Sequence, residues 1–280
     1  MREFSKIILT GAIISAAVFI SPSAWASYGD NLRDTEACTE YSRDDAVTKN
    51  FKYTLNGQEG EVSATMYPQL DNCLGDLKQE TALPNGTHAQ KEDADDKLTI
   101  ENVSQQDFFK ELADNIKKIT DNTNDQARIV ASIGQGFEYE DNDPDEYNYP
   151  YEVAFDQKGI CNETAKFMIG ILRELGFGTA MLTFEKDNHQ VAGIKCDPKF
   201  SYNNSGYCYI ETTTRAIITD DTGIKSQQRA NVISDGLAFD AAPDFSDAQK
   251  YVSILEKGRN KATGNEKEEM KNLRQKYGIS

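Results

Sequence analysis

Histidine is scarce in this sequence, with two in 280 residues, so few side chains are available as a neutral-pH base. Basic residues are also few, because 30 Lys and Arg stand against 46 Asp and Glu, a formal net charge of −16. Such a charge repels phosphate backbones and anionic lipid, which argues against nucleic acid as a partner. Beyond the N-terminal segment, no run is long and apolar enough to cross a membrane. We also find no internal repeat and no low-complexity tract.

The one long apolar run lies at the N-terminus. Two basic residues precede the stretch from Ile7 to Ile20, and Ala24-Trp25-Ala26 has the small-x-small pattern of a cleavage site. This order is typical of a secretory signal peptide over residues 1–26, cut before Ser27. An uncleaved membrane anchor is the alternative, although the run is short for a span. The sequence therefore predicts an exported protein, periplasmic or secreted, with no transmembrane segment after signal removal.

The chain has an odd number of cysteines, namely Cys38, Cys73, Cys161, Cys196 and Cys208. In an oxidising compartment this count suggests two disulfides and one free thiol. Closeness in sequence favours Cys38–Cys73 and Cys196–Cys208, which leaves Cys161 free. Catalysis would explain a free thiol there, and an intermolecular disulfide is the alternative.

Hydrophobic patterning predicts a mixed architecture. Asn56-Gly57 between alternating segments is a strong hairpin signal. Apolar residues at helical spacing predict helices near residues 104–119, 125–137, 161–175 and 246–257, and strand-like runs follow in "TAMLTF", "QVAGIKC" and "YCYIETT". The polar stretch over residues 74–98 is predicted to be an exposed loop or linker, and the charged tail after Gly258 a marginal or partner-bound helix.

These elements divide the chain after the signal peptide into three parts. Residues 27–100 form a hairpin-containing region with a polar linker, and residues 101–245 form the main domain. Residues 246–280 form a helical, partly mobile tail.

The stretch "KGICNETAKFMIGILRELGFG" places Cys161 between a Gly-containing turn and a strong helix pattern. Unpaired N–H groups and the macrodipole at a helix N-terminus favour a thiolate, the attacking form of a thiol. A thiol also needs a base. His189 opens an apolar strand, where backbone hydrogen bonds would hold it, whereas His88 lies in a polar loop. We therefore predict Cys161 as nucleophile and His189 as base.

The base needs an acceptor to orient its second nitrogen. Glu211 ends a strand that otherwise consists of aromatic and β-branched residues, where a carboxylate needs an N–H or cationic partner. A solvated Glu at the sheet rim is the alternative interpretation. Asp197, Asp220 and Asp221 are weaker candidates, because they lie in polar, turn-like sequence.

These residues resemble the transglutaminase-like branch of the papain-like cysteine enzymes, over roughly residues 51–215. The segment from "YPYE" through Gly159-Ile160-Cys161 to the apolar helix resembles the Cys block of that family. "HQVAGI" and "YCYIETT" resemble its His and acid strands. The resemblance implies an α+β fold with a papain/transglutaminase-like core, in which the Cys helix packs on an antiparallel sheet. It also implies that Gln135 supplies an amide to the oxyanion hole.

Two departures from the family accompany this resemblance. The family often has acidic residues on both sides of its Cys, as in Gly-Asp-Cys-Glu-Asp, whereas Ile160 and Asn162 flank Cys161 here. The acid is Glu rather than the more widespread Asp.

The spacing of the strands bears on the second disulfide. If His189 lay directly opposite Glu211, Cys196 and Cys208 would be offset by four residues, and their disulfide would require a bulge or a folded-back loop.

The acidic loop "DNDPDEYNYPYE" offers a weak calcium candidate. Its side chains match calcium-loop positions 1, 3, 5, 7 and 12 with Asp141, Asp143, Asp145, Tyr147 and Glu152. Glu146 occupies position 6, where the sharp turn needs Gly, so a solvated acidic loop is the preferred interpretation. We expect no cofactor.

Together these observations predict an exported thiol hydrolase or peptidase that acts on peptide, isopeptide or glutamine amide bonds of a protein or peptide substrate. Two alternatives stay open. One is an inactive transglutaminase-like fold that binds protein or peptide, and the other is a protein-glutamine transglutaminase.

Overall fold

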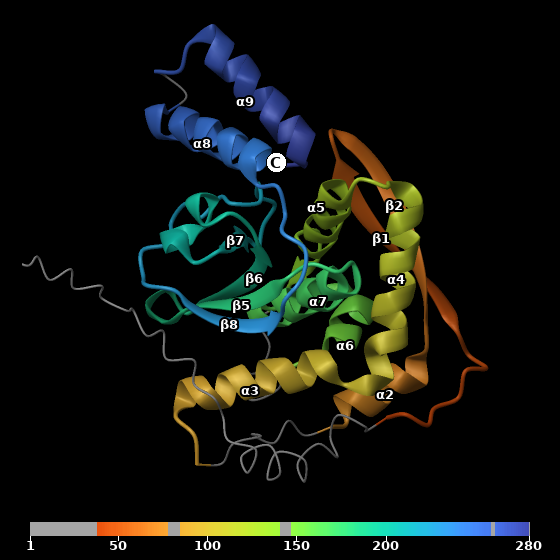
Figure 1. The fold of residues 1–280 in the computed structure, drawn as a ribbon. Helices are drawn as coiled ribbons and strands as arrows, with labels where there is room; N and C mark the ends of the chain where they lie inside the picture. The colour runs from red at the N-terminus through yellow and green to blue at the C-terminus, as the bar shows by residue number, and fades with distance from the viewer. Residues whose placement is uncertain (1–37, 78–84, 141–146, 259–260, 280) are drawn as a thin grey trace, which may run out of the picture.

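A computed structural model describes residues 38–77, 85–140, 147–258 and 261–279 (Figure 1). The predicted signal peptide over residues 1–26 lies outside them, as do Asp141, Asp143 and Asp145 of the calcium candidate. Helices and antiparallel sheets both build the fold, so the predicted α+β class is confirmed. Within the described residues, no helix combines the length and the apolar character that a membrane span requires.

The predicted hairpin is present as β1 (Val47–Leu55) and β2 (Gln58–Met66), paired antiparallel. Asn56 and Gly57 have φ of 51° and 78°, the left-handed values that a type I′ turn requires at both central positions. Phe51, Val62 and Met66 are buried in the main core, so the hairpin shares that core with the helices that follow it.

Helix α7 (Cys161–Glu174) is the centre of the molecule and is buried without interruption from Glu163 to Leu172. It contacts two strands of the main sheet and several helices. Gly170 is needed there, because a Cβ atom at this position would lie 2.5 Å from the Phe109 ring. The helices that contact it are α3 (His88–Glu101), α4 (Gln106–Ile119), α5 (Thr123–Gly134) and α6 (Pro150–Asp156), and α2 (Pro68–Gly75) packs on α6.

The main sheet has the strand order β7-β6-β5-β8, with every pair antiparallel. Its strands are β5 (Thr179–Phe184), β6 (His189–Lys195), β7 (Tyr207–Ile210) and β8 (Arg229–Ser234). The first three were predicted from sequence. Strand β8 was not, because its alternation of exposed and half-buried residues is typical of an edge strand with few buried side chains.

The register of β6 and β7 differs from the one considered from sequence. Ala192 pairs with Ile210 and Ile194 with Cys208, so placing His189 directly opposite Glu211 was wrong by two residues. Cys196 therefore lies only two residues beyond the partner of Cys208. Their Cα atoms are 5.8 Å apart, and the disulfide closes without a bulge in the ladder.

The second disulfide joins Cys38 to the α2 helix at Cys73. Both bridges are the pairings that closeness in sequence favoured. Cys161 is the free cysteine.

The loop predicted over residues 74–98 is wrong for its second half. Helix α3 (His88–Glu101) begins there with a capping box between Thr87 and Gln90. Hydrophobic patterning did not predict this helix because its apolar face is weak. Charged contacts hold it against α7 and β8 instead. Asp96 forms an ion pair with Lys166 of α7, and Arg229 of β8 forms ion pairs with the α3 acids.

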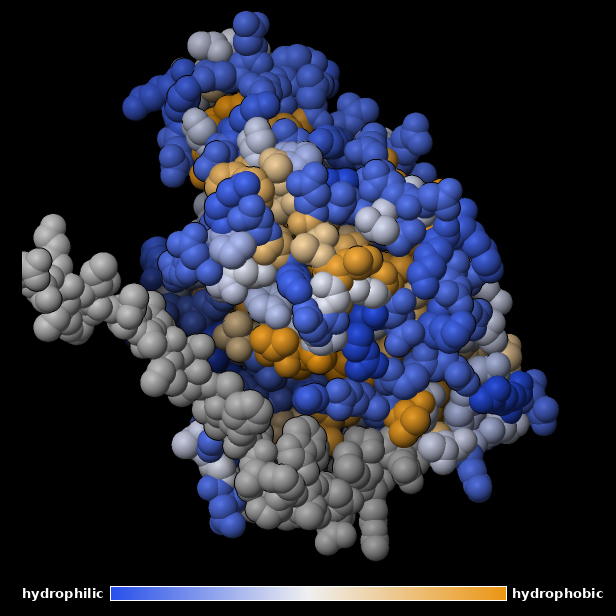
Figure 2. Space-filling view, in the orientation of Figure 1, coloured by the Kyte–Doolittle hydropathy of each residue, from blue (hydrophilic) through white to orange (hydrophobic). Residues whose placement is uncertain are grey.

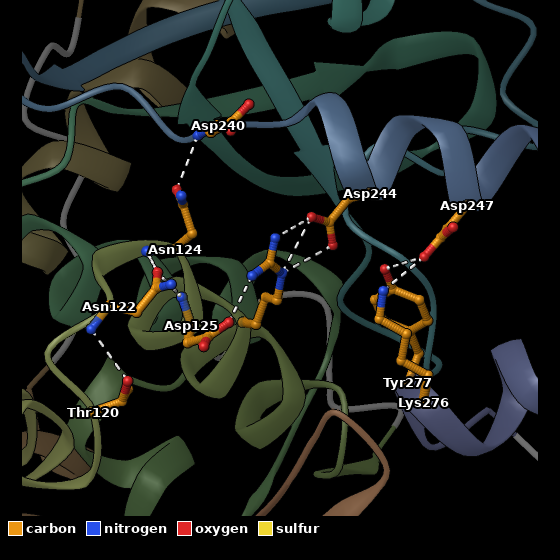
Figure 3. Close-up of polar contacts among 10 residues, drawn as sticks. Thr120, Asn122, Asn124, Asp125, Asp240, Asp244, Asp247, Lys276 and Tyr277 are labelled. Atoms are coloured by element: carbon orange, nitrogen blue, oxygen red, sulfur yellow. Dashed lines mark hydrogen bonds and ion pairs between the residues drawn. The ribbon is translucent and has the colours of Figure 1, made fainter.

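Helices α8 (Ala242–Lys257) and α9 (Gly264–Tyr277) pack on each other as a C-terminal hairpin at one end of the molecule (Figure 1). Asp244 of α8 is fully buried and accepts from the Arg128 guanidinium of α5. Asp247 accepts from Lys276 Nζ and Tyr277 Oη of α9 (Figure 3). The tail is therefore a helix docked within the same chain.

One face of the molecule is largely hydrophilic (Figure 2), which agrees with the high content of charged residues in the sequence. Apolar surface gathers in the centre of that face and between the two C-terminal helices. A groove between α8 and α9 is lined by Ile254, Leu255 and Met270 together with basic residues of α9.

Candidate active site

The N-terminal turn of α7 holds Cys161 in a fixed backbone frame. Ile160 is the N-cap residue and has extended backbone angles. Its N–H donates to Glu163 Oε2 at 2.9 Å, and the Asn148 N–H donates to Glu163 Oε1 at 2.6 Å. The fully buried Glu163 carboxylate thus ties the turn to the preceding loop. The first N–H groups of α7 have no intrahelical acceptor, so they are available at the thiol.

A short parallel bridge supports this turn from the other side. Strand β4 (Lys158–Gly159) immediately precedes Ile160 and pairs with β3 (Glu138–Tyr139). A Cβ atom at Gly159 would lie 3.2 Å from both Val153 and the Glu163 carboxylate, so the turn packs tightly against α6 and α7. Cys161 itself is half-buried.

His189 is the first residue of β6 and is largely buried, with 16% of its side chain exposed. Its Nε2 lies 3.3 Å from Glu211 Oε2, and the Cys161 side chain is close enough to influence the ring electrostatically. Burial alone would lower the pKa of His189. Interactions with Cys161 and with the Glu211 carboxylate outweigh burial and raise that pKa to about 10. The geometry therefore favours a charged imidazolium.

Glu211 follows the last residue of β7 and is held by a dense set of donors. Oε2 accepts from Tyr209 Oη at 2.6 Å. Oε1 accepts from the N–H groups of Thr212 and Thr213, at 2.8 and 2.9 Å, and from Thr213 Oγ1. Burial would raise the pKa of Glu211, but His189 and these donors favour the charged form and lower it to about 2. Glu211 is thus a carboxylate fixed in position.

The weaker sequence candidates have other partners. His88 is the exposed first residue of α3. Asp197 caps a short 3-10 helix (Pro198–Phe200) and pairs with Lys199. Asp220 accepts from Thr222, and none of the described hydrogen bonds joins Asp220 or Asp221 to His189. The structure therefore brings together Cys161, His189 and Glu211 and leaves these four residues apart.

Gln135 does not supply the oxyanion donor that the resemblance implied. Its Nε2 donates to the carbonyl oxygens of Glu211 and Ala216, both at 3.1 Å. Because these two bonds use both amide hydrogens, neither is left for an oxyanion. The side chain instead binds the loop that follows Glu211.

Glu152 is the one described acid of the calcium candidate set. Its Oε2 accepts from the Tyr149 N–H within the N-terminal turn of α6. Burial raises the pKa of Glu152 to about 7, and nearby acids add to the shift. Among the described residues, no group of three or more metal-ligating side chains comes together.

Three residues of this site were missed by the sequence reasoning. Tyr209 lies two residues before Glu211 on the same strand, and Thr213 lies two residues after it. Glu163 lies two residues after Cys161. Local sequence could have indicated two of these roles. An acid at the third helical position predicts a capping interaction, and Thr hydroxyls beside a carboxylate predict hydrogen-bond donors to it.

The fold and the Cys–His–Glu grouping define a class, the α+β proteins in which a cysteine begins a central helix beside a sheet. Residues 110–214 match the family model of the transglutaminase-like superfamily. This segment contains all three grouped residues. The hairpin and the C-terminal helices lie outside it, although the sequence resemblance began near residue 51. Comparison with curated proteins and with solved structures gave no match.

Proposed function

We propose that the protein is an exported cysteine acyl-transfer enzyme, a thiol hydrolase or peptidase. The observation that carries the proposal is the position of His189, whose ring contacts the Glu211 carboxylate at 3.3 Å and lies beside Cys161 at the N-terminus of α7. A thiol, a base and an orienting carboxylate in this order form the arrangement that nucleophilic cysteine catalysis needs.

In the proposed reaction, the Cys161 thiolate attacks the carbonyl carbon of an amide bond. The tetrahedral intermediate collapses when the His189 imidazolium gives its proton to the leaving amine, and an acyl-thioester remains on Cys161. Water then attacks this thioester while His189 takes a proton from it, and the acid product and the thiol are released.

The oxyanion of each tetrahedral intermediate needs donors that point at it in advance. We assign this role to the backbone N–H groups at the N-terminus of α7, beginning with that of Cys161. Glu163 supports the role, because its two backbone hydrogen bonds fix the turn that orients these groups. Glu211 supports the other half of the reaction by holding one nitrogen of His189.

Export and a protein or peptide substrate belong to the same proposal. Two disulfides support an oxidising compartment, where a single remaining thiol needs a use. The acidic chain favours polypeptide over nucleic acid as the substrate.

The test is hydrolysis of a panel of fluorogenic peptide amides and glutamine-containing peptides, with the wild type and Cys161→Ala compared. We expect release of product by the wild type and none above background by the variant. Full activity in Cys161→Ala would contradict the mechanism. Adding a labelled primary amine separates hydrolysis from transamidation, because only a transglutaminase would attach the label to the glutamine side chain. Binding of a peptide without turnover would instead indicate a recognition module.

A further inference from the structure

The amide of Gln135 binds the backbone around Glu211 at three points. Besides its two donor bonds to the Glu211 and Ala216 carbonyls, its Oε1 accepts from the Ala216 N–H at 3.3 Å. Gln135 is buried, with 7% exposure, at the C-cap of α5. One of its acceptors is thus the main chain of Glu211 itself, and the other two bonds close the loop over residues 211–216.

Gln135 belongs to one face of α5 that binds several distant segments. Arg128, Ser132 and Gln135 are spaced four and three residues apart, so they lie on the same side of the helix. Arg128 binds the buried Asp244 of α8. Ser132 Oγ accepts from Arg215 Nη1 of the same loop at 3.0 Å and from the Thr54 N–H of β1 at 2.7 Å.

This arrangement gives the loop two anchors on a rigid element. Helix α5 is buried along most of its length and packs against α7, which carries Cys161. The Glu211 backbone is therefore fixed, through Gln135, to a helix that also contacts the nucleophile helix. The donors from Thr212 and Thr213 to the Glu211 carboxylate come from the same loop, so their positions depend on the loop staying closed.

We propose that Gln135 is a positioning residue that holds the Glu211 loop on α5 and thereby keeps the carboxylate in place for His189. This role rests on the proposed function, in which Glu211 orients His189. It replaces the oxyanion role that both engaged amide hydrogens of Gln135 exclude.

Gln126 offers a matched control on the same helix. It is similarly buried, and its Nε2 donates to the Thr120 carbonyl at 2.8 Å, far along the chain from the Glu211 loop. Gln135→Met and Gln126→Met each remove one buried amide and keep the length of the side chain. A general loss of stability affects both variants, whereas a positioning effect separates them.

The histidines provide the readout, because the chain has only His88 and His189. We would follow both rings by NMR between pH 5 and 11, with exposed His88 as the internal reference. In Gln135→Met, loosening of Glu211 is expected to lower the titration midpoint of His189 by about one pH unit. Gln126→Met is expected to match the wild type, and Ser132→Ala to show a smaller shift in the same direction. Ser132→Ala also serves if Gln135→Met does not fold.

Hydrogen exchange of residues 211–216 completes the test. Faster exchange in Gln135→Met than in Gln126→Met, together with the shifted His189 midpoint, is the expected result. An unchanged midpoint, or equal shifts in both variants, would overturn the positioning role. Failure of the proposed function has a different signature: His189→Ala would leave the pH profile of Cys161 alkylation unchanged, whatever the two glutamine variants do to the His189 titration.

Discussion

Two buried carboxylates in this molecule have cationic partners at nearly the same distance but opposite pKa shifts. Glu211 lies 3.3 Å from His189 Nε2, and Asp96 lies 3.2 Å from Lys166 Nζ. Glu211 has a pKa lowered to about 2. Burial, only partly offset by Lys166, raises the pKa of Asp96 to about 6.

The difference lies in the donors that surround each group. Glu211 accepts from Tyr209 and from the residues of the following loop, whereas Asp96 Oδ2 has no hydrogen-bond partner among the described residues. Asp96 is also more deeply buried, with 2% of its side chain exposed against 14% for Glu211. A single cation therefore does not compensate for burial, while a cation with several donors does. Only the second arrangement keeps an anion ready to orient a base.

The largest expected effect comes from breaking the Asp96–Lys166 pair. Lys166→Met leaves a buried carboxyl without its cation, so we expect a loss of about 3–5 kcal/mol in unfolding free energy near neutral pH. Replacing both partners, in Asp96→Leu/Lys166→Met, is expected to restore most of the loss. Urea denaturation measures both. If the double variant were as unstable as the single one, the ion pair would stabilise the folded state more than the raised pKa of Asp96 implies.

The two carboxylates should also oppose each other in the pH dependence of stability. The folded pKa of Glu211 is below its ordinary value of 4.5, so its contribution is present above pH 4.5 and is lost as pH falls toward 2. The folded pKa of Asp96 is above its ordinary value of 3.8, so its contribution is most favourable below pH 3.8 and declines as pH rises through about 6. Each effect amounts to about 3 kcal/mol at most.

Denaturation curves of Glu211→Gln and Asp96→Asn between pH 2.5 and 8 test these opposite signs. We expect Glu211→Gln to lose the acid-side slope and Asp96→Asn to lose the decline between pH 4 and 6. Slopes that stayed equal to the wild type in both variants would contradict the assignment of the two groups.

Thiol reactivity should distinguish the two carboxylates more simply. Glu211→Gln weakens the partner of His189, so we expect the alkylation rate of Cys161 at pH 6.5 to fall by about tenfold. Asp96→Asn lies outside the Cys–His–Glu chain and is expected to keep the wild-type rate. A comparable fall in both variants would indicate a general loosening of the fold.

Removing one donor from Glu211 should have the smallest effect. Tyr209 Oη donates to the same oxygen that faces His189, and its ring is buried. Because the Thr donors remain, Tyr209→Phe is expected to lower the alkylation rate at pH 6.5 by only about threefold. The pH profile, rather than stability alone, is the measurement that decides, since a purely structural effect of removing the buried hydroxyl would leave that profile unshifted.

Much of the architecture was predictable because it depends on local patterns. The Asn56-Gly57 turn, the α7 helix after Cys161 and the strands β5, β6 and β7 each have a strong signal in the sequence. Helix α3 and strand β8 lack such a signal, because ion pairs between them and with α7 replace much of the apolar face. Long-range charge pairing is invisible to a periodicity argument.

The candidate site shows the same limit. The residue types at Cys161, His189 and Glu211 were sufficient to predict that they form a group, because the sequence offers only two histidines as a base. The role of Gln135 depends on which carbonyls its amide meets across a sequence separation of more than 70 residues. The β6–β7 register, wrong by two residues in the sequence-based hypothesis, is set by the loop over residues 197–206, whose left-handed turns at Asn203 and Asn204 no simple pattern predicted.

The most direct test of the central proposal is the alkylation rate of Cys161 by iodoacetamide as a function of pH, in the wild type and in His189→Ala. A thiol with an ordinary pKa of about 8.5 is only about 1% ionised at pH 6.5, so an assembled Cys–His pair should react up to about 100-fold faster there. We predict a rate that persists well below pH 8 in the wild type and is lost in the variant. An ordinary thiol profile, identical in both proteins, would contradict the account.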